Sequence, residues 1–197
     1  MVFGYLNIPW TSIVLPYDDE KTPLHLTGIK MLPIFQNSEI TTNESLIIIK
    51  YLDKNNQLYT KELLKDPELK KFEAILDEIG SNVHSLAMPY WIYTPEFNDT
   101  SRKYFQNKKE KKRGPFKDLV TKREHFITGL NESIKNLSLS LNPYYLSNTF
   151  RLYDVMLASH LWGMYVVPEF QFEPHIHDYL QRVKELTKFN YHQDFWK

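Results

Sequence analysis

The stretch MLPIFQNSEITTNES at residues 31–45 combines residue types that can hold a small polar ligand. Pro33 follows Leu32 at the start of an apolar run, and Glu44 and Ser45 stand where a helix is expected to begin. Free N–H groups at a helix N-terminus and a serine hydroxyl can bind a carboxylate, while a glutamate carboxylate accepts hydrogen bonds from an ammonium group. Whether these residues act together depends on the elements that position them.

Each half of this pattern also has an ordinary structural interpretation. A Leu-Pro pair more often opens an edge strand with a trans peptide bond, since only about 5–6% of X-Pro bonds in folded proteins are cis. Ser45, or Asn43 before it, can simply cap the helix. Neither half identifies a ligand by itself.

Short elements surround this stretch in the first quarter of the chain. Residues 10–15 (WTSIVL) are rich in β-branched residues and are followed by a proline, which predicts a strand. A short helix is expected over residues 22–27, stopped by Gly28 in a left-handed conformation. Residues 31–36 and 40–41 flank a polar turn and predict an antiparallel hairpin.

After the hairpin the sequence predicts one helix after another. Asn43 or Thr42 can cap the first helix, which should end over residues 53–57. Apolar residues at intervals of three and four then predict five longer helices. They cover residues 67–88, 98–114, 120–141, 153–167 and 174–186, with Pro89 ending the first of them.

The order of elements predicts a fold class of α/β plus all-α, mostly helical overall. We place a small α/β unit at residues 1–56, a connector at residues 57–65 and an all-helical domain at residues 66–197. These lengths lie within the usual range for domains.

Composition excludes several classes of function. The chain has 24 Lys plus Arg and 24 Asp plus Glu among 197 residues, so no net charge attracts nucleic acid or an anionic membrane. No segment approaches the roughly 18 consecutive apolar residues of a membrane span, and the N-terminus does not resemble a signal peptide. We therefore expect a cytoplasmic protein. The basic run at residues 108–114 is expected to be a solvated helix end.

The chain contains no cysteine, which excludes disulfides, thiolate metal ligands and cysteine nucleophiles in the sequence as given. His175 and His177 are two residues apart, so on a helix they point to different faces, and no acidic pair completes a site. We expect no bound metal.

The α/β unit with its Leu-Pro hairpin and Glu-Ser helix start, followed by helices, resembles the glutathione S-transferase superfamily. Within it, the runs MVFGYLNIPW, IKMLPIF, TTNESLIIIKYLD and FNDTSRKYFQNKKE resemble the bacterial glutaredoxin 2 family over almost the whole chain. The resemblance implies an N-terminally truncated thioredoxin-like unit followed by a glutathione S-transferase-type helical domain.

The resemblance assigns roles to the opening stretch. It implies that Pro33 is cis and that Leu32 offers its backbone N–H and C=O to the cysteinyl part of glutathione. It implies that Glu44 and Ser45 hold the γ-glutamyl end, and Lys30 stands where it can pair with the glycine carboxylate. Glutathione is thus the expected co-substrate. Disulfide-containing or glutathionylated proteins are the expected partners, with no nucleic acid and no membrane.

The sequence departs from the family pattern in two places. The family begins with a strand and a Cys-Pro-Tyr-Cys motif, whereas residues 1–4 resemble the interior of the helix that follows the motif. We expect that the natural protein begins upstream of Met1, or else that the flanking elements close the gap in the sheet. Further on, Asp154 matches a family capping residue, but Arg151 stands where Ser or Thr is usual. We expect that helix without its standard reciprocal cap, with Thr149 as a cap in a shifted register.

This pattern predicts a glutaredoxin 2-like, glutathione-dependent thiol–disulfide oxidoreductase with no catalytic residue in the chain, so that it is inactive as written. Whether the chain is an enzyme stays open. The alternatives are a cysteine-free glutathione-binding or glutathione S-transferase-like protein, and a non-catalytic protein-interaction module. Tyr90, Trp91 and Tyr93 either overhang the glutathione site or pack between the domains.

Overall fold

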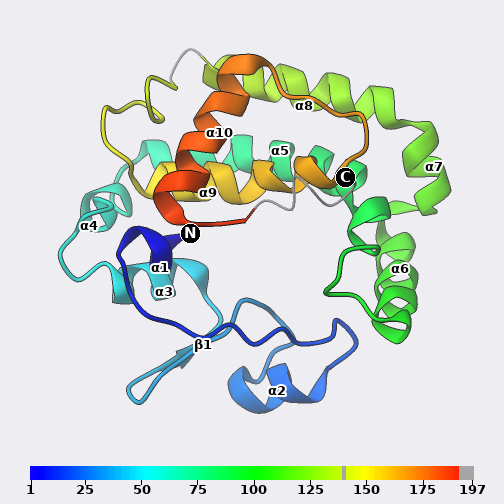
Figure 1. The fold of residues 1–197 in the computed structure, drawn as a ribbon, viewed down its shortest axis with the longest axis horizontal. Helices are drawn as coiled ribbons and strands as arrows, with labels where there is room; N and C mark the ends of the chain where they lie inside the picture. The colour runs from blue at the N-terminus through cyan, green and yellow to red at the C-terminus, as the bar shows by residue number, and fades with distance from the viewer. Residues whose placement is uncertain (139–140, 191–197) are drawn as a thin grey trace.

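The computed structural model describes residues 1–138 and 141–190. Most of these residues are helical, and Figure 1 shows a small N-terminal part, in blue and cyan, beside a larger group of helices. The predicted fold class, α/β elements followed by helices with helix predominant, is confirmed. No helix in the described part is both long and apolar enough to cross a membrane.

The N-terminal part is built from short elements. Helix α1 (Val2–Tyr5) is followed by irregular chain up to helix α2 (Lys21–Thr27). Gly28 ends α2 in a left-handed conformation with φ 74°, and its N–H donates to the Leu24 carbonyl. This end agrees with the prediction, because glycine adopts a positive φ at little cost.

The predicted hairpin is present but shorter than its sequence pattern. Strands β1 (Phe35–Gln36) and β2 (Thr41–Thr42) pair antiparallel, and together they make up the sheet of the described residues. In the turn between them, the Asn37 side chain accepts hydrogen bonds from the backbone N–H groups of Glu39 and Ile40. The polar turn thus closes the hairpin as expected.

The strand predicted over residues 10–15 is wrong. These residues are irregular, and their backbone forms no hydrogen bond to another backbone group within the described part. Trp10, Ile13 and Val14 are 60%, 79% and 62% exposed. β-branched residues favour a strand only where a neighbouring strand offers a backbone edge and a packing surface, and none pairs with them here.

Helices α3 (Ser45–Leu52) and α4 (Thr60–Leu63) are joined by a turn that a buried aspartate organises. Asp53 ends α3, and its carboxylate accepts from the Gln57 N–H at 2.6 Å and from the Thr60 hydroxyl at 2.7 Å. The helix therefore ends where the sequence predicted.

The rest of the chain is helical, and each predicted helix is represented there. The helices are α5 (Glu68–Trp91), α6 (Asp99–Arg113), α7 (Phe116–Thr121), α8 (Arg123–Ser138), α9 (Leu152–Leu161), the 3₁₀ helix η1 (Trp162–Val166) and α10 (Pro174–Thr187).

Two predicted helix boundaries are wrong. Helix α5 passes through Pro89, the predicted stop, and ends two residues later. The proline removes one backbone donor, but Met88 and Pro89 are buried, so packing of this turn outweighs the lost hydrogen bond. The helix predicted over residues 120–141 is instead divided into α7 and α8 at Lys122, where the sequence has no helix-breaking residue. Residues 139–140 of that prediction lie outside the described part.

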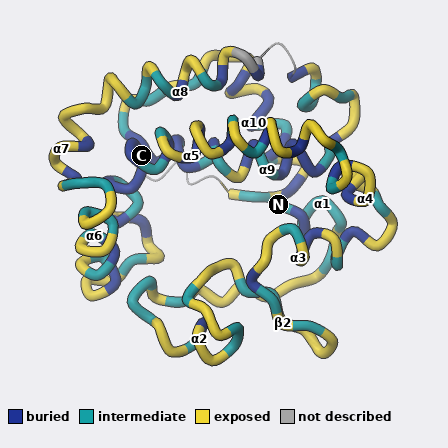
Figure 2. The backbone as a smooth tube through the Cα atoms, turned by 180° about the vertical axis from the view of Figure 1, so that it is seen from behind, coloured by how far each residue is buried: buried dark blue, intermediate teal, exposed yellow. Residues whose placement is uncertain are grey.

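One hydrophobic core joins the N-terminal part to the helices. Helix α5 contacts α8 and α9, and Figure 2 shows buried residues along these helices. Val2 of α1 and Ile49 of α3 belong to the same buried cluster. Helix α1 also lies against the end of α10, where a Cβ on Gly4 would be 1.8 Å from the Thr187 carbonyl oxygen. Only glycine permits this approach, so the helices fix the position of α1.

A buried carboxylate fixes the start of α9. Asp154 is fully buried and accepts hydrogen bonds from the backbone N–H groups of Tyr145 and Arg151, both at 2.8 Å, and from the Tyr179 hydroxyl at 2.9 Å. Burial raises the pKa of Asp154 to about 6, although these three donors act in the opposite direction. Arg151 is the N-cap residue of α9, and the hydrogen bond from its backbone N–H to Asp154 is one half of a capping box. The other half needs an acceptor on the N-cap side chain, which the Arg151 guanidinium does not have.

Replacing Asp154 by Ala should lower the free energy of unfolding by about 3 kcal/mol, because three buried donors lose their acceptor. Equilibrium urea unfolding followed by circular dichroism measures this change. Asp99→Ala, at a side chain that is 91% exposed, is the control. It should change the free energy by less than about 0.5 kcal/mol. Equal effects of the two substitutions would contradict the assigned role of Asp154.

His84 on α5 has a strongly lowered pKa. Its Nδ1 lies 3.5 Å from an Nη atom of Arg113, and its ring meets Trp91 edge-on. Burial, followed by the positive charges of Arg113 and Lys109, lowers the pKa of His84 to about 4. The imidazole is therefore neutral in the folded protein at pH 7.

The contribution of His84 to stability should fall as the pH decreases from about 6.5 to about 4, since the unfolded chain then binds a proton at His84 that the folded protein does not. The raised pKa of Asp154 acts in the opposite direction over this range, so the effect is measured as a difference from the His84 variant. His84→Gln should remove up to about 3 kcal/mol of this pH dependence. Urea unfolding near both ends of the range measures it, with the exposed His25→Gln as control. An unchanged slope in His84→Gln would disprove this linkage.

Candidate functional site

The predicted site residues meet at one end of the hairpin. Because β1 and β2 are antiparallel and the first residue of β1 pairs with the last of β2, the chain enters β1 and leaves β2 at the same end. The entering segment carries Leu32 and Pro33, and the leaving segment carries Glu44 and Ser45. We call these four residues the cradle.

Leu32 presents an unpaired stretch of backbone. The Leu32–Pro33 peptide bond is cis, as predicted. Neither the N–H nor the C=O of Leu32 bonds to another backbone group among the described residues, and Leu32 is 53% exposed. An extended ligand can pair with these two groups in the manner of an added strand.

Glu44 and Ser45 form the exposed start of α3. Glu44 is the N-cap residue, in an extended conformation, and no side chain caps this helix. Asn43, a predicted cap, is buried and instead donates to the Thr27 hydroxyl at 3.2 Å, which ties α3 to α2. The first N–H groups of α3 therefore lack a capping side chain, and they can hold an anion beside the Ser45 hydroxyl.

Lys30 lies in a contact between the N-terminal part and α6. Its ammonium is 3.5 Å from the Glu20 carboxylate and 4.1 Å from the centre of the Tyr104 ring. The Tyr104 hydroxyl donates to the same carboxylate, and the hydroxyl and Lys30 together hold the pKa of Glu20 below its usual value. A ligand carboxylate would have to compete with Glu20 for the charge of Lys30.

This contact with α6 is the feature that sequence reasoning missed. Tyr17 meets Phe105 edge-on, with ring centres 4.6 Å apart, and stacks against Phe97 at 6.1 Å. Residues 102–105 belong to the run FNDTSRKYFQNKKE, which resembles the glutaredoxin 2 family. That resemblance is the available signal, because this run supplies the side chains of α6 that meet the N-terminal part.

The cradle can bind a ligand but supplies no thiol. The chain has no cysteine, so the polar side chains of the cradle are a carboxylate and a hydroxyl. In residues 1–138 and 141–190, no group of three or more His, Asp or Glu side chains could hold a metal ion. The arrangement suits recognition of a peptide-like ligand that has a charged end.

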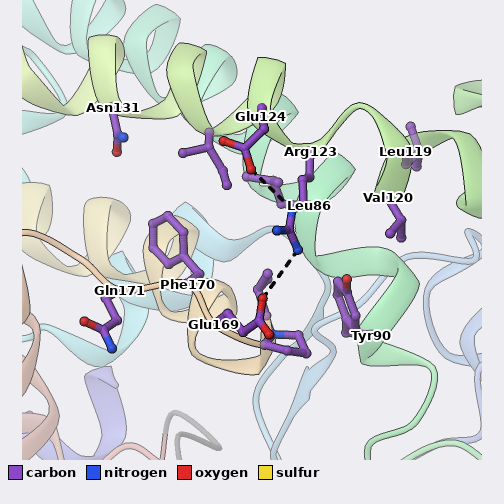
Figure 3. Close-up of a pocket in the computed structure, with 13 residues that line it drawn as sticks. Leu86, Tyr90, Leu119, Val120, Arg123, Glu124, Asn131, Glu169, Phe170 and Gln171 are labelled. Carbon is purple, nitrogen blue, oxygen red and sulfur yellow. Dashed lines mark hydrogen bonds and ion pairs between the residues drawn. The ribbon is translucent and has the colours of Figure 1, made fainter.

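A cavity of about 360 Å³ lies in the helical part, away from the cradle. Figure 3 shows Arg123 of α8 reaching toward Glu169, with Tyr90 and Phe170 on the walls. The Arg123 guanidinium lies 3.3 Å from Glu124 and 3.6 Å from Glu169. Because both glutamates pair with this arginine and Asn131 and Gln171 also line the cavity, its walls are partly polar and offer no free cation among the lining residues.

The aromatic residues near the end of α5 pack within the helical part. Tyr90 lines the cavity, and Trp91 stacks on Trp162 with ring centres 6.4 Å apart. Tyr93 is 53% exposed and lies 5.4 Å from the Arg102 guanidinium. These contacts lie within the helical part, so they show neither packing between the domains nor an overhang of the glutathione site.

Comparisons with known proteins agree with this architecture. A protein-family model described as "Glutaredoxin 2, C terminal domain" matches residues 71–195, more than half of the chain. Glutaredoxin 2 of Escherichia coli K12 is 29% identical over 195 residues, which cover 96% of this chain and 89% of that protein. Glutaredoxin 2 of Escherichia coli O157:H7 gives the same values.

A crystal structure of glutaredoxin 2 from Salmonella typhimurium in complex with glutathione is also similar. Its TM-score to this chain is 0.82 at 26% identity, over 96% of this chain and 88% of that one. The similarity thus extends beyond the helical part to the elements that carry the cradle. From the family match and this shared fold, we conclude that the chain belongs to the glutaredoxin 2 family.

Proposed function

We propose that this protein binds glutathione on the cradle formed by Leu32, Pro33, Glu44 and Ser45. The observation that carries the proposal is the unpaired backbone of Leu32 at the end of the hairpin where the uncapped start of α3 also lies. These features suit a peptide with a charged amino-acid end. The glutathione complex of the similar Salmonella protein supports this choice of ligand.

Each residue of the site has a distinct role in this proposal. The N–H and C=O of Leu32 pair with the cysteinyl part of glutathione. The first N–H groups of α3 and the Ser45 hydroxyl hold the γ-glutamyl carboxylate, and Glu44 accepts from the ammonium group. Lys30 assists the glycine carboxylate only after releasing Glu20, so its contribution is smaller.

We further propose that the chain acts in glutathione-dependent thiol–disulfide exchange, in the cytoplasm, on disulfide-containing or glutathionylated proteins. In this reaction a thiolate attacks a disulfide sulfur, and glutathione resolves the mixed disulfide. The chain has no cysteine, so as written it binds glutathione without supplying the nucleophile. In the proposed division of the chain, residues 1–56 form the unit that holds the ligand. Residues 57–65 connect this unit to the helical domain, which we place at residues 66–197.

Glutathione should bind the chain as written, and Glu44→Gln should weaken binding roughly tenfold, because it removes a charge-assisted hydrogen bond. Ser45→Ala should weaken it roughly threefold through loss of a neutral hydroxyl. Calorimetry with S-methylglutathione, which cannot exchange with disulfides, measures both. Asp99→Asn, at the exposed start of α6, is the matched control. Unchanged affinity in both cradle variants would contradict the cradle, and no binding at all would favour a protein-interaction module.

Joining a strand that ends in Cys-Pro-Tyr-Cys upstream of Met1 should create glutathione-dependent disulfide reduction, because the first cysteine supplies the thiolate. Reduction of 2-hydroxyethyl disulfide, coupled to glutathione reductase, measures it. The same extension with Ser-Pro-Tyr-Ser is the control. If the extended chain binds glutathione but reduces no disulfide, the exchange proposal fails while the binding proposal stands. Conjugation of a chlorodinitrobenzene by the chain as written would instead identify a transferase.

A further inference from the structure

The C-terminal half of α6 carries five cations, four of which form two adjacent pairs about one turn apart. Lys108, Lys109, Lys112 and Arg113 follow one another at spacings of one and three residues, which places them along one side of the helix. Within the described part of the chain, no Asp or Glu forms an ion pair with any of them. We call these four residues the α6 basic face.

The acidic side chains around this face are engaged elsewhere. Glu110, which interrupts the basic run, accepts from the backbone N–H of Phe116 at 2.8 Å and from Gln106 at 2.9 Å. It therefore serves the start of α7. Glu20 accepts from Tyr104 and pairs with Lys30. Glu20 also attracts Lys108, so these groups compensate the positive charge of the α6 basic face only in part.

Lys109 and Arg113 of this face pack against other elements. Lys109 is half-buried, and its ammonium lies 5.4 Å from the ring centre of Phe105 and 5.9 Å from that of Tyr17. Arg113 donates to the Ser85 hydroxyl on α5 at 3.2 Å. The helix dipole favours cations in the last turn, but it does not account for this packing on aromatic rings and on α5. The predicted solvated helix end describes the exposed Lys108 and Lys112, but not Lys109 and Arg113, which are partly buried.

The members of this face repel one another. Burial lowers the pKa of Lys109, and the charges of Arg113, Lys108 and Lys112 lower it further. Arg113, Lys109 and Lys112 also contribute to the lowered pKa of His84. A bound anion would relieve part of this repulsion, so the face gains more from an anionic partner than an ordinary lysine surface does.

Lys30 extends the α6 basic face toward the cradle. The ammonium groups of Lys30 and Lys108 lie over the same Tyr104 ring, 4.1 and 5.5 Å from its centre. Lys30 stands two residues before Leu32. Figure 1 shows α6 and α2 toward the same end of the molecule, separated by a gap. A partner bound to the face would therefore lie close to the cradle.

We propose that the α6 basic face, continued by Lys30, docks an acidic segment of a protein partner beside the cradle. Carboxylates suit lysine ammonium groups, which act as separate point charges. Nucleic acid fits less well, because lysines cover the rings of Tyr17 and Tyr104 and because the chain has no net charge. This proposal rests on the proposed function in one respect, namely that the partner is a disulfide-containing or glutathionylated protein with acidic residues near its sulfur.

Fluorescence anisotropy with a labelled hexaglutamate peptide tests the docking surface directly. The peptide should bind at low salt and dissociate as salt increases, whereas labelled hexalysine should not bind. Lys109→Gln/Lys112→Gln should weaken hexaglutamate binding roughly tenfold. Lys65→Gln/Lys70→Gln, which removes the same charge from exposed positions elsewhere, is the matched control and should retain the affinity.

Three results would overturn the proposal. They are no binding of hexaglutamate at low salt, an equal loss in the two double variants, and tighter binding of a hexathymidylate oligonucleotide than of the peptide. Circular dichroism and thermal unfolding establish that the variants fold. The affinity of each variant for S-methylglutathione should match that of the unmodified chain, so a failure of the cradle is recorded separately from a failure of the docking surface.

Discussion

The placement of the cradle depends on a buried carboxylate that is distant from it in sequence. Asp154 joins the start of α9, the segment before it and α10 through three hydrogen bonds. Helix α10 in turn holds α1 at the close approach between Gly4 and Thr187, and α1 contacts α3, whose N-terminus forms half of the cradle. Because a buried carboxylate with three donors has few alternative arrangements, it determines how these helices meet.

The N-terminal part needs this external support because its own sheet is small. A two-stranded hairpin is marginally stable by itself in water. One support comes from the core that α1 and α3 share with the helices, and the other comes from α6. There Tyr17 packs on Phe105, and Tyr104 donates to Glu20. The cradle therefore belongs to a part of the chain that the helices hold in two places.

The sequence predicted the features whose cause is local. Gly28 ends α2 and Asp53 ends α3 because the geometry of a helix end depends on a few neighbouring residues. Residues 10–15 failed as a strand because pairing needs a partner that propensity does not include. Pro89 failed as a stop because burial of its turn is a tertiary effect. The four cradle residues lie at one end of the hairpin, and their role in binding stays a prediction. The engagement of Lys30 by Glu20 was not predicted, because it depends on how α6 packs.

Recognition and chemistry are separable in this architecture. In the proposed site, the binding groups are the backbone of Leu32 and the N–H groups at the start of α3, which exist whatever side chains surround them. Thiol chemistry instead needs one sulfur at one position, and no cysteine is present in this sequence. A site made largely of backbone can thus keep its affinity for a peptide ligand independently of a nucleophile. The only thiol that such a complex would contain is that of glutathione itself, so any reactivity would be set by how the cradle orients the ligand's own sulfur.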